Sequence, residues 1–194
     1  MTIRRGEPWG VELPRPDDLR PATADREIVE FAGRGGPIGL AGGDVHRSLG
    51  APGPRDPVLR VELDGVEVEL GDGRVLLGVA HVLVRRSWWR GRVVACMNVD
   101  HLGDWNVAPR AHPNDGRLDI VECSPTMPLR ARWAARRRLV AGTHVPHPDI
   151  EVGRVRERSW TFARPHRVWI DGVDVGRTEM LTVRCLDDRF VVHF

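Results

Sequence analysis

Residues 97–123, MNVDHLGDWNVAPRAHPNDGRLDIVEC, decide the fold. They lead from one β-like run, residues 93–98, through a polar loop with glycine to a second β-like run, residues 118–123. Short apolar runs bounded by Gly, Pro, Asn and Asp are typical of strands. The same pattern extends outward over most of the chain after residue 57. We therefore predict a mainly β fold, a two-sheet β-sandwich with a few short helices.

Two helices, two turns and one long strand can be placed more closely. Apolar spacing and end signals predict helices over residues 24–32 and 128–140. Asp64-Gly65 and Asp171-Gly172 are each typical of a hairpin turn. The long apolar run at residues 75–84 predicts a central strand.

The bulk composition limits the classes of function. The 194 residues, 41% of them hydrophobic, suffice for one core, so we predict a single domain over residues 1–194. The 29 basic and 27 acidic residues nearly cancel, so we expect no nucleic-acid partner. The sequence contains no lysine, which excludes P-loop nucleotide hydrolases and Schiff-base enzymes.

Cysteine usage and the N-terminal sequence bear on the compartment. Cys96, Cys123 and Cys185 lie far apart within apolar runs, which favours buried free thiols in a reducing compartment. The N-terminus has no apolar signal core, and no run approaches the roughly 20 apolar residues of a membrane span. We expect a cytoplasmic protein.

Four segments, taken in order, carry a resemblance to a known family. They are PIGLAGGDVHRSLG at residues 37–50, LDG at 63–65, the stretch from Ala108-Pro109 to Asp119, and VWIDG at 168–172. This order resembles the C-terminal β-rich domain of the diacylglycerol kinase and sphingosine kinase superfamily, lipid kinases of the NAD kinase-like fold group. The resemblance covers residues 37–194 and implies the sandwich of that domain. Residues 1–36 would then be an irregular N-terminal extension with a short helix.

The resemblance implies a chemistry, phosphoryl transfer to a lipid, with Mg²⁺ and ATP as cofactors if the domain is active. Asp44 and Arg47 fall on the aspartate and arginine of the first motif, and Asp171 on the aspartate of the last. Asp44 and Asp171 are therefore the catalytic candidates. Asp44 and Asp64 are the candidate Mg²⁺ ligands, because hard cations prefer carboxylate oxygens. The candidate ligand-binding residues are Arg47, Trp88, Trp89, Asp115 and Gly116.

Two departures from the family argue against full activity. The family has an N-terminal α/β nucleotide domain, and only about 40 residues precede the match here, so we expect that domain to be missing. The family's catalytic glutamate corresponds to Val173, which cannot accept a proton or bind Mg²⁺. We expect a domain that binds a lipid or phosphorylated small molecule without kinase activity of its own. The alternatives are a reduced but active ATP-dependent lipid kinase, and a protein interaction module.

The candidate acidic residues also have a purely structural interpretation. Asp64, Asp115 and Asp171 each precede glycine, as residues in tight turns do. Asp44 could serve as the N-cap of a short helix. Both interpretations remain open at this point.

Tryptophan and arginine suggest two possible contact surfaces. Trp88-Trp89 lies among arginines and could meet a lipid interface or stack on a ligand, or else pack into the core. The arginine-rich helix at residues 130–138 could contact anionic head groups, or form a solvated face. The predicted partners are therefore a lipid or phosphorylated ligand, a partner chain or second copy, and a peripheral membrane contact.

Overall fold

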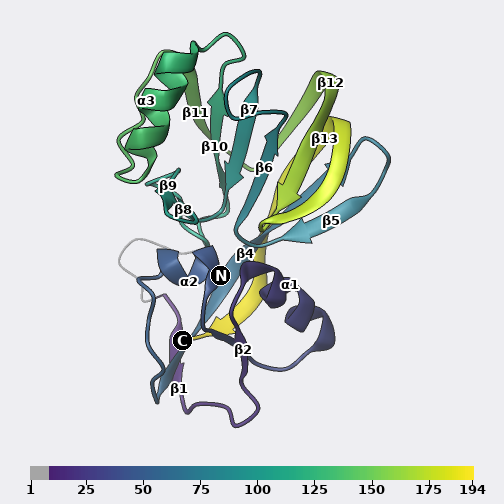
Figure 1. The fold of residues 1–194 in the computed structure, drawn as a ribbon. Coiled ribbons are helices and arrows are strands. Elements are labelled where there is room, and N and C mark those ends of the chain that lie inside the picture. The colour runs from purple at the N-terminus through teal and green to yellow at the C-terminus, as the bar shows by residue number, and fades with distance from the viewer. Residues whose placement is uncertain (1–8) are drawn as a thin grey trace.

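The computed structural model describes residues 9–194, which form three helices and thirteen strands (Figure 1). The helices are α1 Asp25–Arg34, α2 Gly43–Ser48 and α3 Leu129–Leu139. The strands are β1 Val11–Leu13, β2 Arg20–Ala22, β3 Ile38–Leu40, β4 Val58–Leu70, β5 Val75–Gly78, β6 His81–Arg85, β7 Val93–Met97, β8 His101–Leu102, β9 Trp105–Asn106, β10 Leu118–Cys123, β11 Ile150–Val155, β12 Glu157–Ile170 and β13 Val173–His193. The predicted mainly β class is confirmed.

Eleven strands belong to one continuous sheet, and β8 and β9 form a separate small pair. The main path runs β1-β4-β13-β12-β6-β7-β10-β11, with β2, β3 and β5 attached at its side. The two faces of the predicted sandwich are halves of this one sheet. Val68 and Val183 from one half share a core with Val94 and Ile120 from the other. Such fully buried side chains each contribute about 1.5–3 kcal/mol.

A second core lies at the other end of the long strands, under the two N-terminal helices. Ile28 of α1 and Val45 of α2 are fully buried there against Val61 and Val192 of β4 and β13. The predicted helices are confirmed at Asp25–Arg34 and Leu129–Leu139. None of the helices among residues 9–194 is long and apolar enough to cross a membrane.

Residues 11–13 and 20–22 correct the expectation of an irregular N-terminal extension. Val11 pairs with Arg60 across β1 and β4, and β2 pairs in parallel with β3. The N-terminal segment therefore belongs to the main sheet. Its Pro-rich composition gave no alternation from which these short strands could be predicted.

Two further predictions about the strands are wrong, each because of a buried aspartate. Asp64-Gly65 is not a turn but lies inside β4, where the fully buried Asp64 faces an irregularity of β13 between Leu186 and Phe190. The predicted strand 75–84 is divided into β5 and β6 at residues 79–80, whose N–H groups bond to Asp171. The Asp171-Gly172 turn is confirmed, with φ of 47° and 79°.

Candidate functional site

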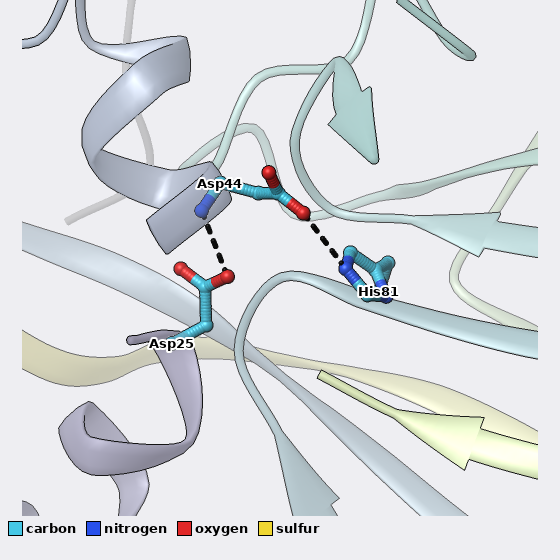
Figure 2. A group of neighbouring side chains, drawn as sticks. All are labelled: Asp25, Asp44 and His81. Carbon is cyan, nitrogen blue, oxygen red and sulfur yellow. Dashed lines mark hydrogen bonds and ion pairs between the residues drawn. The ribbon is translucent and has the colours of Figure 1, made fainter. Parts of the chain in front are cut away.

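Asp44 and His81 form a hydrogen-bonded pair at the start of β6, with His81 buried and Asp44 partly exposed (Figure 2). His81 Nε2 lies 3.0 Å from Asp44 Oδ2, and the His81 side chain is only 4% exposed. The Gly103 N–H donates to the same carboxylate at 2.9 Å. Asp44 therefore links α2 to β6 and to the β8–β9 turn.

Asp25, at the start of α1, holds the first turn of α2 (Figure 2). Its carboxylate accepts the N–H groups of Asp44 at 2.8 Å and Val45 at 2.9 Å. The N-cap position itself is Gly42, so Asp44 is not the N-cap that one interpretation of the sequence proposed. Gly43 has a φ of +88°, and a Cβ there would lie 2.4 Å from Asp25 Oδ1. Only glycine fits this close approach.

Asp171 approaches the same pair from the β12–β13 turn. Its carboxylate accepts the N–H groups of Val79, Ala80 and His81 at 2.9–3.0 Å. The structure thus brings both predicted catalytic residues to His81, Asp44 to its side chain and Asp171 to its backbone N–H. We call Asp25, Asp44, His81 and Asp171 the His81 cluster.

The electrostatics of the His81 cluster favour an ion pair. Burial disfavours the charged form of His81, but the Asp44 hydrogen bond and the surrounding carboxylates outweigh it and raise the pKa of His81. Burial opposes the charge of Asp44 as well, yet the bonds from His81 and Gly103 lower the pKa of Asp44 overall. Burial raises the pKa of Asp25 to about 6 and also raises the pKa of Asp171.

This donor set does not fit Mg²⁺. His81 Nε2 is hydrogen-bonded to Asp44 Oδ2, so one oxygen of the Asp44 carboxylate is already engaged. The oxygens of Asp25 and Asp171 accept backbone N–H groups, and Mg²⁺ requires near-ideal octahedral oxygen ligands that keep several waters. The geometry instead resembles a polar hub that ties α1, α2, β6 and the β12–β13 turn together.

Asp64 belongs to a different cluster from Asp44. Its carboxylate accepts the N–H groups of Gly116 at 2.7 Å and Asp188 at 3.0 Å. Cys185 also lies within reach of Asp64, but burial raises the pKa of the Cys185 thiol to about 12, so it stays protonated. A protonated thiol is a poor metal ligand. The predicted ligand pair Asp44 and Asp64 is therefore not brought together as one group of neighbouring ligand atoms.

The other polar candidates are engaged in local contacts. Arg47 pairs with Asp104 at 3.4 Å on the surface. Asp115 is hydrogen-bonded to Arg154 and to the N–H of Arg117. Gly116 holds Asp64, as described above. These contacts explain the residues structurally without requiring a ligand.

Trp88 and Trp89 lie on the β6–β7 loop and pack toward α3. The Trp88 and Trp105 rings meet edge to face at 5.3 Å, and Arg136 of α3 lies 5.4 Å from the Trp89 ring. Both tryptophans line an apolar cavity of about 100 Å³ beneath α3. Ligand sites typically measure about 300–1,000 Å³, so this cavity is too small for a lipid.

A larger, strongly basic cleft lies on the other side of the same loop. It has a volume of about 920 Å³ and no acidic side chain in its lining. Its arginines come from the end of β6, from the β6–β7 loop and from β12 and β13. We call it the arginine cleft, and its seven arginines are Arg85, Arg86, Arg90, Arg92, Arg164, Arg167 and Arg177.

Strand pairing assembles the arginine cleft. Arg85 of β6 lies directly opposite Arg167 of β12, which places two like charges side by side. Burial and the charge of Arg167 lower the pKa of Arg85, whose guanidinium lies 4.3 Å from the Trp88 ring and 4.4 Å from the Trp169 ring. The His81 cluster and the arginine cleft occupy opposite ends of β6, about 13 Å apart at 3.3 Å per residue.

Sequence reasoning missed Asp25, His81 and the arginine cleft. A histidine within the apolar run 75–84 was the available signal for His81, because a polar residue there must be paired when buried. Asp25 gave no signal, since an acidic residue in the first turn of a helix is ordinary. The cleft arginines are spread over residues 85–177, and only the pairing of β6 with β12 brings them together.

Of the comparisons with known proteins, only that with solved structures found matches. No protein-family model and no curated protein sequence matches the chain. Among solved structures, three from Bacillus anthracis str. Sterne are similar, one named as a diacylglycerol kinase and two given that name provisionally. Their TM-scores are 0.56, 0.59 and 0.57 at 13%, 14% and 13% identity. The chain has a diacylglycerol kinase-like fold.

The match covers 80% of this chain and 66–69% of the three solved chains. The diacylglycerol kinase-like domain described here therefore corresponds to about two thirds of each of those proteins. At this level of identity the likeness establishes the fold, and activity has to be argued from the sites.

Proposed function

We propose that this diacylglycerol kinase-like domain binds a phosphorylated ligand in the arginine cleft and does not transfer phosphate by itself. The observation that carries the proposal is the cleft itself, about 920 Å³ with seven arginines and no acidic residue in its lining. Arginine presents a planar fork of N–H donors that matches phosphate geometry, and such charge-assisted bonds are about twice as strong as neutral ones.

Most of the cleft arginines have their charge available. Arg92 pairs with Glu122 at 3.0 Å and Arg167 with Asp174 at 3.3 Å. The other five have no ion pair with any residue of the described chain, 9–194: Arg85, Arg86, Arg90, Arg164 and Arg177. A dense group of unpaired like charges repels itself, so an anion in the cleft would be stabilised.

The arrangement around the His81 cluster supports the absence of autonomous transfer. Phosphoryl transfer depends on positioning and on neutralising phosphate charge with metal ions and donors. The Asp25 and Asp171 carboxylates are occupied by backbone N–H groups, and Asp44 is paired with His81. Val173 is the first residue of β13, beside Asp171, and offers no proton acceptor. A separate chain that supplies a nucleotide site remains a prediction, testable by co-purification.

Calorimetric titration tests the proposal with two probes, glycerol 3-phosphate and short-chain phosphatidic acid. We expect Arg86→Ala with Arg164→Ala to weaken binding of both about tenfold or more, since each loses a charge-assisted bond. Arg26→Ala with Arg117→Ala removes the same charge at exposed sites outside the cleft and should leave binding unchanged. Binding of phosphatidic acid alone would identify a lipid ligand, and equal binding of both would identify the phosphate group as the recognised part.

Two results would contradict the proposal. One is the absence of binding by either probe at low salt, where arginine–phosphate attraction is strongest. The other is phosphorylation of a lipid by the purified chain with ATP and Mg²⁺, lost in Asp44→Asn, which would establish the reduced-kinase alternative instead.

A further inference from the structure

The outer face of α3 carries an exposed apolar stripe. Leu129, Trp133 and Val140 are 53%, 54% and 64% exposed. Val140 is the C-cap of α3 and keeps helical φ and ψ, so at 100° per residue the three positions lie within about 40° of one another around the helix axis. Large apolar side chains exposed in one row, rather than scattered singly, mark an interaction surface. We call these three residues the α3 stripe.

Arginines flank the α3 stripe, and the segment that carries it has no acidic residue. The sequence from residue 123 to residue 148 contains no Asp or Glu. Arg137 lies 4.7 Å from the Trp133 ring, beside the stripe. The exposed arginines of the helix have no ion pair with the part of the chain that the structure describes: Arg130, Arg136, Arg137 and Arg138. The face is therefore both apolar and strongly cationic.

The inner side of α3 is firmly anchored, so the stripe is not a core face that has lost its partner. Arg132 is only 4% exposed, and its guanidinium donates to the carbonyls of Met127, Trp88, Gly91 and Ser124. In Figure 1, α3 packs along the edge of the molecule far from β1 and the C-terminus. The helix is held in place with its stripe toward solvent.

We propose that α3 docks on an anionic phospholipid bilayer. Trp, Leu and Val on one face of a helix with arginines beside them are the composition of a helix that lies in the headgroup region. The α3 stripe would enter the boundary of the acyl chains, and the arginines would contact lipid phosphates with their stems along the apolar surface. Two other partners fit this surface less well. A second copy of the chain would place arginines next to arginines. A purely acidic protein surface would pair with the arginines but would offer the α3 stripe no apolar contact.

This inference goes beyond ligand binding in the arginine cleft, because it rests on α3 alone. The two surfaces adjoin at the β6–β7 loop and at residues 124–125, and Arg132 is bonded to both segments. A domain that binds a soluble phosphate in the cleft could dock on a membrane through α3, and either property could be lost without the other.

Co-sedimentation of the full chain with vesicles tests the inference. We expect binding to phosphatidylcholine vesicles that contain phosphatidylserine, and much weaker binding to pure phosphatidylcholine. Trp133→Ser should weaken partitioning of the chain onto the vesicles about tenfold, because the variant no longer buries one large apolar side chain when it binds. Arg130→Gln with Arg137→Gln should weaken it about fivefold for each arginine, and less at high salt.

Matched controls separate docking from unfolding and from the cleft. Val75→Ser removes an equally exposed apolar side chain, 58% exposed on β5, and should not change partitioning. The effect of Trp133→Ser should persist when Arg86 and Arg164 are both alanine, so failure of the cleft proposal would leave this result intact. Partitioning unchanged by both α3 variants would overturn the inference, as would a dimer of the free chain that Trp133→Ser dissociates.

Discussion

At the scale of single residues, His81 and Asp44 predict a stability that depends on pH. Removing one partner of a buried ion pair costs about 3–5 kcal/mol, and partly exposed Asp44 places Asp44→Asn at the lower end, about 3 kcal/mol. The raised pKa of His81 stabilises the fold fully below its ordinary value of 6.5, and this contribution is lost as pH rises through the folded value. The lowered pKa of Asp44 stabilises the fold fully above the ordinary pKa of 3.8, and this stabilisation is lost as pH falls through the pKa of Asp44 in the folded state.

The stability difference between wild type and Asp44→Asn should therefore be largest at about pH 4–6.5 and smaller at about pH 9. Urea unfolding across this range measures it. Asp25 and Asp171 still face His81 in the variant and retain part of the effect. A difference that grows steadily toward alkaline pH would show that His81 is not the charged partner.

Asp25 predicts a pH dependence opposite in sign to that of Asp44 and equal in sign to that of His81. Its pKa is raised from 3.8 to about 6, so the folded state binds more protons than the unfolded state between these values. This residue therefore makes stability fall as pH rises from about 4 to about 6. Asp25→Asn should remove that slope and should cost about 1–3 kcal/mol above about pH 6, where the ionised carboxylate accepts both α2 N–H groups and the amide oxygen replaces only one acceptor. An unchanged slope in the same unfolding experiment would contradict the assignment.

At the scale of elements, Arg132 is the residue that attaches α3 to the β6–β7 loop. Its donors meet four carbonyls, so Arg132→Met leaves several buried acceptors unpaired and should cost about 3 kcal/mol. Hydrogen exchange should become faster across residues 86–92, which the guanidinium anchors. Arg138→Met is the matched control, exposed on the same helix, and should change stability by less than about 0.5 kcal/mol. Equal exchange in both variants would show that the loop is held by other contacts.

The helices and strands also show which structural features could be predicted from sequence patterns. The helices at residues 24–32 and 128–140 were predictable because apolar spacing and end signals are local. Asp64-Gly65 and the run at residues 75–84 were misassigned because their conformations depend on hydrogen bonds to partners distant in sequence. For Asp64 these partners are the N–H groups of Gly116 and Asp188. Asp171 was recognised as a turn residue, but its second function, dividing β5 from β6, required the three-dimensional structure.

At the scale of the whole molecule, the fold could be anticipated and the candidate ligand site could not. The order of short motifs predicted a lipid-kinase-like β domain, and the similarity to solved structures confirms that fold. The arginine cleft is assembled by the register of β6 on β12, which no local pattern encodes. The predicted catalytic pair does meet at His81, where backbone hydrogen bonds support a structural role. The molecule thus combines a closed polar hub at one end of β6 with an open cationic cleft at the other.

The most direct test of this account is a calorimetric titration with short-chain phosphatidic acid, with and without Mg²⁺. We predict binding that does not require Mg²⁺, that persists in Asp44→Asn, and that is lost when Arg86 and Arg164 are replaced by alanine. Binding that requires Mg²⁺ and disappears in Asp44→Asn, while the arginine variant behaves as wild type, would contradict the account and locate the ligand site at the His81 cluster.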